Sequence, residues 1–178
     1  CLGDNIMLDF NFYNGTTPFT INYTENGVTL SEGPINNTNP YSITASPSQT
    51  MTNYDNIYAI VSVTDSGGCI NQNIINQEIV NVNILPEIIT STGPNPVCID
   101  QNSSLNFNSI SGIHPIIIEY NITDVNGTTL ANEIIGSGGL TLPIAINTTT
   151  TYEIISLIDD SLCPNTSSQI EVITVNPL

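Results

Sequence analysis

Four cysteines offer the most distinctive chemistry in this 178-residue chain, namely Cys1, Cys69, Cys98 and Cys163. Cysteines form disulfides in oxidising compartments, whereas clustered thiols and imidazoles bind zinc. Because the chain has only one His and no Cys-x-x-Cys pair, the sequence disfavours a zinc site. The first and second cysteines are nearly as far apart in sequence as the third and fourth, which predicts the bridges Cys1–Cys69 and Cys98–Cys163. The remaining pairings would join one half of the chain to the other.

Carboxylates are the second candidate for chemistry. Asp159 and Asp160 lie just before Cys163, and Asp65 lies in the same place before Cys69. Their oxygens could bind Ca²⁺, and Glu87 could hold an ion at the junction of the two halves. The alternative is that these acidic residues only form polar turns. The sequence therefore predicts no metal site, and Ca²⁺ is the one cofactor that it leaves open.

The charge of the chain limits its partners. It contains 16 acidic residues and neither Lys nor Arg, so its net charge is −16. Such a surface repels nucleic acid and anionic membranes, and no run of about 18 apolar residues could insert into a bilayer. No nucleophile with a neighbouring base and no phosphate-binding loop can be assembled from these residues. We therefore expect no enzyme, no nucleic-acid partner and no membrane insertion.

An internal repeat positions the cysteines and acidic residues. The segment 1–5 matches 98–102, and Tyr58–Asp65 matches Tyr152–Asp159, with Cys69 then falling on Cys163. The matches predict two domains, 1–86 and 87–178. Residues 87–97 have no counterpart before Cys1, so we expect the first repeat to lack its first strand and the chain to be a piece of a longer array.

Within each repeat, apolar residues alternate with polar ones, as in Ile6, Leu8 and Phe10, which is typical of half-buried strands. The dipeptides Asn26-Gly27 and Asn126-Gly127 predict hairpins with type I′ turns, which need positive φ at both central residues. Short strands separated by Gly, Pro and Asn predict an all-β chain of two tandem Ig-like antiparallel β-sandwich domains with one disulfide each.

The two runs that end in Cys69 and Cys163, together with the pattern Cys-x-x-x-Asn-x-x-Leu-x-Phe after Cys1 and Cys98, resemble polycystic-kidney-disease-type and related Ig-like repeats. Such repeats occur in the giant cell-surface adhesins of Bacteroidota, including those of gliding motility. The resemblance implies a stalk, filament or adhesin outside the cell. Asp160-Ser161-Leu162 also resembles an acceptor for O-glycosylation in Bacteroidota, with Ser161 as the modified residue.

Three functions follow as hypotheses. The first is a structural stalk or filament repeat that spaces a functional tip of a long extracellular adhesin from the cell, with neighbouring repeats of the same chain as its partners. The second is an adhesive module that binds glycans or surface proteins, for which the Tyr-rich first repeat is suited. The third is a pilus or surface-layer protomer that self-assembles through edge strands. Lipid attachment to Cys1 is a further alternative to its disulfide.

Overall fold

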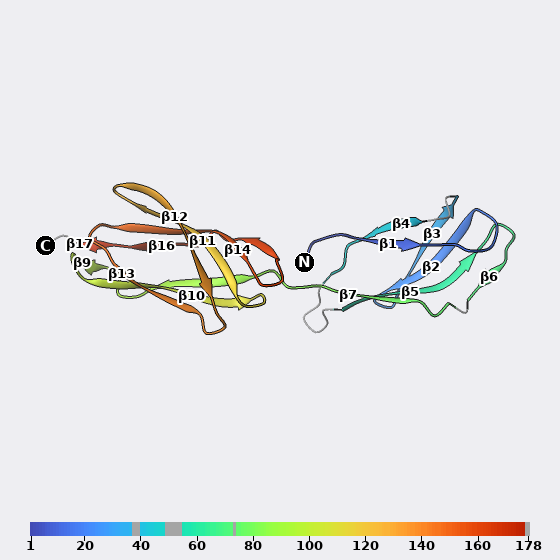
Figure 1. The fold of residues 1–178 in the computed structure, drawn as a ribbon, viewed down its shortest axis with the longest axis horizontal. Coiled ribbons are helices and arrows are strands. Elements are labelled where there is room, and N and C mark those ends of the chain that lie inside the picture. The colour runs from blue at the N-terminus through green and yellow to red at the C-terminus, as the bar shows by residue number, and fades with distance from the viewer. Residues whose placement is uncertain (37–39, 49–54, 73, 177–178) are drawn as a thin grey trace. The chain divides into compact units, whose positions relative to one another are not determined.

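The computed structural model describes residues 1–36, 40–48, 55–72 and 74–176. The chain is all-β, as the sequence predicts, and the part that the model describes contains no helix. It divides into two compact units, Cys1–Val82 and Asn83–Leu178, called unit 1 and unit 2 below. Figure 1 shows the strands of both units.

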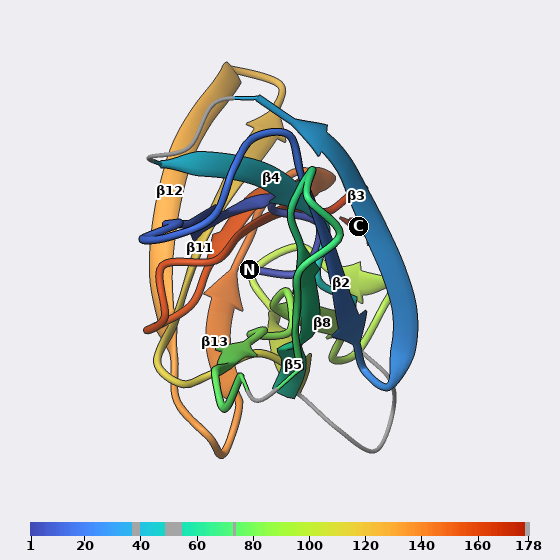
Figure 2. The same cartoon turned by 90° about the vertical axis from the view of Figure 1, so that its right-hand side faces the viewer.

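Unit 1 contains two antiparallel sheets. The smaller sheet pairs two strands, β1 (Ile6–Phe10) and β4 (Tyr41–Ala45). The larger sheet has the order β3 (Val28–Ile35), β2 (Phe19–Glu25), β5 (Asp55–Thr64) and β6 (Ile70–Asn71), with β7 (Gln77–Asn81) also paired to β5. β3 and β4 therefore belong to different sheets, and Figure 2 shows them running in different directions.

Unit 2 has the same plan with additional strands. Its larger sheet has the order β12 (Gly127–Ile135), β11 (Ile116–Asp124), β14 (Thr150–Ile158) and β15 (Pro164–Thr166), with β16 (Ile170–Ile173) also on β14. Its smaller sheet has three strands, β13 (Leu140–Ala145), β10 (Asn102–Ser111) and β8 (Glu87–Thr92). A short parallel pair joins β9 (Val97–Cys98) to β17 (Val175–Asn176).

The two units match in register as well as in strand order. Leu8 of β1 lies opposite Ile43, and its sequence counterpart Leu105 of β10 lies opposite Leu142. In the larger sheets, Tyr58 lies opposite Glu78 and its counterpart Tyr152 lies opposite Glu171. Each residue of unit 1 in these strands therefore has a defined counterpart in unit 2. β8, β9 and β17 have no counterpart among the described strands of unit 1.

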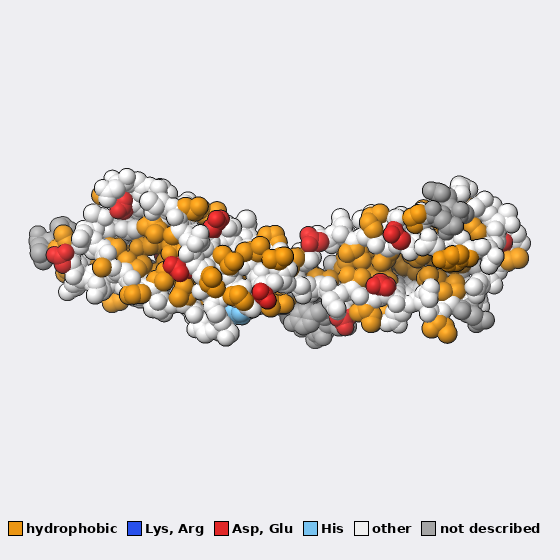
Figure 3. Space-filling model, viewed as in Figure 1, with side chains coloured by type: hydrophobic (Ala, Val, Ile, Leu, Met, Phe, Trp, Pro, Cys, Tyr) orange, Lys and Arg blue, Asp and Glu red, His pale blue; other side chains and the backbone are white. Residues whose placement is uncertain are grey.

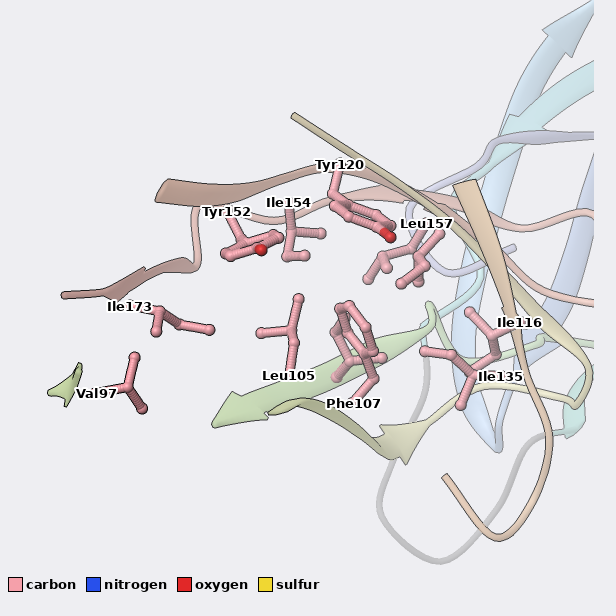
Figure 4. Packing of buried hydrophobic residues seen from close by; sticks show 12 residues of the cluster. Val97, Leu105, Phe107, Ile116, Tyr120, Ile135, Tyr152, Ile154, Leu157 and Ile173 are labelled. Atoms are coloured by element: carbon pink, nitrogen blue, oxygen red, sulfur yellow. The ribbon is translucent and has the colours of Figure 1, made fainter. Parts of the chain in front are cut away.

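The apolar cores of the units differ in continuity. In unit 2, twelve buried residues form one cluster that extends from Val97 to Ile116 and includes the fully buried Phe107 (Figure 4). In unit 1 the buried residues form two clusters of three, one around Leu8 and the other around Phe19. The alternating pattern thus gives both units an inward-facing apolar surface. Only in unit 2 do the buried residues of that surface form a single core.

The boundary between the units lies at 82/83, four residues before the predicted boundary at 86/87. Residues 83–86 belong with unit 2 because their backbone is held there. The Ser111 hydroxyl donates a hydrogen bond of 2.7 Å to the Leu85 carbonyl, and the Asn165 amide donates one of 2.9 Å to the Pro86 carbonyl. Gly112 permits this packing, since a Cβ at that position would lie 2.8 Å from the Pro86 Cα.

The two predicted hairpins form, but their turns differ. Asn26 and Gly27 have φ values of 50° and 83°, as a type I′ turn requires. In unit 2 the prediction is wrong by one residue, because Asp124 pairs with Gly127 and the turn residues are Val125 and Asn126. The Asp124 carboxylate accepts a 2.7 Å hydrogen bond from the Asn126 N–H, which holds the earlier turn.

Candidate functional site

A groove opens in unit 1 between its two sheets. It has a volume of about 690 Å³ and runs along β1 on one side and along β5 and β7 on the other. Apolar side chains line it, namely Leu8, Phe10, Tyr23, Tyr58 and Val80. A second hollow of about 630 Å³ shares Asp9, Phe10, Ile60 and Asn76 with the groove and continues it along the unit. Figure 3 shows apolar side chains gathered in this hollow (right-hand side).

Strand β8 fills the corresponding place in unit 2. It pairs antiparallel with β10, so that Thr92 lies opposite Leu105 and Thr90 opposite Phe107. Its side chains alternate between core and solvent: Ile88 is 2% exposed, whereas Ile89 is 52% exposed. Burial of one Ile side chain contributes about 1.5–3 kcal/mol. β8 therefore supplies both backbone pairing and an apolar contact that the described part of unit 1 lacks.

Two polar side chains of unit 2 hold β8 from the opposite sheet. The Gln169 side-chain oxygen accepts hydrogen bonds from the Thr90 N–H at 2.8 Å and from the Thr90 hydroxyl at 2.9 Å. The Gln169 amide also donates to the Ile88 carbonyl. A Glu171 carboxylate oxygen lies 2.9 Å from the same Thr90 hydroxyl. These bonds contact the backbone of β8 at Ile88 and Thr90, and the hydroxyl of Thr90.

Unit 1 carries the same polar pair at the edge of its open groove. Glu78 lies opposite Tyr58, as Glu171 lies opposite Tyr152. Asn76 occupies the place of Gln169, because its carbonyl accepts a 3.2 Å bond from the N–H of Ile60, just as the Gln169 carbonyl accepts one from Ile154. Asn76 and Glu78 both line the groove. The groove thus keeps the polar groups that grip a strand in unit 2.

Asp65 organises the loop before Cys69. Its carboxylate accepts hydrogen bonds from the N–H groups of Cys69 at 2.9 Å and Thr16 at 3.2 Å. These bonds, that of Cys69 foremost, hold the pKa of Asp65 below its ordinary value. The side chain acts as an acceptor for backbone donors, which is the role of a polar turn.

Asp159 has the same role in unit 2, where it is buried. It accepts bonds from the N–H groups of Ile113 at 2.9 Å, Cys163 at 3.0 Å and Ser161 at 3.1 Å, and from the Ser161 hydroxyl at 2.8 Å. Burial raises the pKa of Asp159, but the hydrogen bonds outweigh burial and the net pKa is lowered. The carboxylate is therefore ionised and fully occupied with the loop.

The structure does not gather the other predicted site residues around a common point. Asp160 is exposed, and Glu87 is an exposed residue at the start of β8, opposite Ser111. Over the described ranges, no group of three or more His, Cys, Asp or Glu side chains is placed to hold a metal ion. The hydroxyl of Ser161, the predicted glycosylation site, donates to Asp159 and is half-buried.

The predicted cysteine pairing is wrong. Cys69 and Cys98 are free thiols on the surface. Neither the predicted bridge Cys1–Cys69 nor the predicted bridge Cys98–Cys163 is present.

Strand length explains why the predicted bridges cannot form. In unit 2, Cys98 pairs with Asn176 beyond the Thr150 end of β14, whereas Cys163 follows the Ile158 end. A nine-residue strand is about 26 Å long, and a disulfide needs Cα atoms about 4.4–6.8 Å apart. Unit 1 has the same arrangement, since Figure 1 shows the N-terminus and β6, which follows Cys69, at opposite ends of that unit.

The tyrosines of unit 1 mostly serve its core. Tyr58 is buried and donates a 2.8 Å hydrogen bond to Glu25, and Tyr41 donates one of 2.6 Å to Glu32. Burial is the first cause of the raised pKa of Tyr58, followed by its bond to Glu25. Tyr13 is 88% exposed and is available to a partner. Of the five tyrosines in the first repeat, Tyr54 lies outside the described residues.

No family model and no curated protein matches the chain. The resemblance to surface-adhesin repeats therefore stays a prediction. A search of the described residues for a helix long and apolar enough to cross a membrane finds none.

Proposed function

We propose that this chain is a structural repeat of a long extracellular surface adhesin, and that its two units act as spacers between the cell and a functional tip. The observation that supports this proposal most strongly is the equivalence of the two units. They share strand order, register and the hydrogen-bonded aspartate loop, although their surfaces differ. Repetition that preserves the scaffold is the property expected of a spacer array.

The connection between the units and the charge also support a spacer. Val82 is buried in unit 1 and Pro86 is buried in unit 2, so only three residues lie between two anchored positions. The uniform negative charge, with no Lys or Arg, disfavours association between parallel copies. The two folded modules are thus joined by a short link, as a spacer array requires.

Pulling on single molecules tests the spacer function. The chain would be held by its ends in reducing buffer, so that no disulfide limits its extension. We expect two separate unfolding steps, each adding roughly 27–35 nm of contour length, because about 82–96 residues extend at about 3.3–3.6 Å per residue. A single gradual extension without force peaks would contradict the proposal, because a spacer must resist force through folded units.

An adhesive module remains the alternative, and the open groove of unit 1 is the observation that favours it. Screening of the intact chain against immobilised glycans and surface proteins separates the two functions. Saturable glycan binding that Tyr13→Ala abolishes would favour the adhesive module, whereas a spacer binds none of them. Assembly into a pilus or surface layer predicts concentration-dependent polymers in light scattering, which a spacer does not form.

A further inference from the structure

The groove of unit 1 is a sandwich seam with one strand missing from the described residues. In unit 2, β8 lies against β10 and contacts β16, closing the seam. The counterparts of β10 and β16 in unit 1 are β1 and β7, and side chains of both strands line the groove. Because β1 pairs only with β4, its other edge has backbone groups without a strand partner in the part of the chain described. Such an edge is a template for strand addition.

The groove also has the side chains that β8 needs. Leu8 and Phe10 replace Leu105 and Phe107 on the strand that would pair with it, and Val80 replaces Ile173 on the facing sheet. Asn76 and Glu78 replace the polar pair that grips Thr90. Five positions that contact or flank β8 in unit 2 thus keep their chemical character in unit 1.

We infer that the groove of unit 1 binds an extended, nearly uncharged peptide strand with the pattern of β8, X-Ile-X-Thr-X-Thr, antiparallel to β1. The register follows from unit 2: the second Thr lies opposite Leu8, the first Thr lies opposite Phe10, and the Ile points into the seam. Asn76 and Glu78 bond to the strand at the first Thr. This inference does not rest on the spacer function.

Charge decides between an isolated strand and a second folded copy as the occupant. A second copy brings another net charge of −16 to a chain of the same charge. A strand like Glu87–Thr92 has a single acidic residue at its start, so its electrostatic penalty is small. The groove is also bordered by Asp9 and Glu78, which disfavours acidic peptides further.

The test uses the intact chain and a synthetic peptide of residues 87–97 with blocked ends and a fluorescent label. Fluorescence anisotropy measures its binding. In the intact chain the seam of unit 2 is filled by its own β8, so the peptide has one open seam to occupy. We expect saturable binding, and we expect it to slow amide hydrogen exchange in β1.

Two peptide variants and two protein variants make the test specific. Ile88→Asp in the peptide should abolish binding because the side chain enters the seam, whereas Ile89→Asp should keep it because that side chain faces solvent. In the protein, Asn76→Ala and Glu78→Ala should each weaken binding about two- to tenfold, while Thr29→Ala on the exposed face of β3 should not. Equal binding of the two peptide variants, or no binding of the parent peptide up to its solubility limit, would overturn the inference.

Discussion

The strands that unit 1 and unit 2 share have the same register, yet unit 2 has one continuous core and unit 1 has two small ones. The difference coincides with β8, whose Ile88 lies in the single cluster of unit 2. In unit 1 the corresponding place is an open groove between Leu8 and Val80. Among the described residues, the strands of unit 1 keep the register of unit 2 without a strand in the seam, and in unit 2 that strand joins the local clusters into one core.

The same comparison applies to the aspartate loops. Asp159 and Cys163 are buried in unit 2, whereas Asp65 is half-buried and Cys69 is exposed in unit 1. Each carboxylate accepts a hydrogen bond from the N–H of the following cysteine. Each also accepts one from the loop between two earlier strands, which is the β1–β2 loop in unit 1 and the β10–β11 loop in unit 2. The two units therefore share the loop structure. The contribution of the aspartate hydrogen bonds to stability depends on how far water is excluded from the loop.

The largest expected effect comes from truncating the matched core phenylalanines. Phe107→Ala should lower the free energy of unfolding of unit 2 by about 4 kcal/mol, because it empties a fully buried site. Phe10→Ala should cost unit 1 about half as much, because Phe10 is half-buried beside the groove. Urea unfolding followed by hydrogen exchange in each unit measures both. Equal losses would mean that the seam of unit 1 is closed.

The matched aspartates come next. Asp159→Ala should destabilise unit 2 by about 2–3 kcal/mol, because the part-buried N–H of Ile113 and the buried N–H of Cys163 lose their acceptor. Asp65→Ala should destabilise unit 1 less, because water replaces the lost acceptor in the more exposed loop. Thermal unfolding of the two variants checks the order. The account fails here if the Asp65 variant loses more stability than the Asp159 variant.

Acid should act on the same groups. The folded pKa of Asp159 is lowered, so its contribution is complete above the unfolded value of about 3.9 and is lost as pH falls through the folded value. We expect the stability of unit 2 to decline below about pH 4. Asp159→Asn should flatten this part of the decline in a pH series of unfolding curves. An unchanged slope in that variant would assign the acid sensitivity to other carboxylates.

The smallest expected effect concerns the side-chain hydrogen bonds that hold β8. Thr90→Val keeps the shape of the side chain but removes its hydroxyl bonds to Gln169 and Glu171, which should cost unit 2 about 1 kcal/mol. Ile89→Thr, on the exposed face of the same strand, is the matched control and should be nearly neutral. Urea titrations resolve the difference. If the two variants have the same midpoint, the polar grip does not stabilise β8.

Much of the fold follows from short-range sequence signals. The alternation through Leu8 and Phe10 predicts a half-buried strand, and the matched run through Tyr58 and Tyr152 predicts the same strand in each half. Both are found, and the all-β prediction is confirmed. These signals suffice because side-chain direction in a strand depends only on residue parity.

The sites could not be predicted in the same way. Sequence separation matched the two cysteines of each half, but it does not tell at which end of a long strand each one lies, and Cys98 and Cys163 lie at opposite ends of β14. The turn at Asn126 moved because the Asp124 side chain holds an earlier one. The groove of unit 1 depends on a seam between distant segments, and the matched residues Asn76 and Gln169 gain meaning only once their strands are paired.

Hydrogen exchange of the intact chain, read by mass spectrometry in peptides from β1 and β10, tests the central claim most directly. The account predicts that amides of β1 exchange faster than those of β10, because β1 has one open edge and β10 has strands on both sides. Added peptide 87–97 should slow β1 and leave β10 unchanged. Equal protection of β1 and β10 without peptide would contradict the account, since unit 1 would then have no open seam.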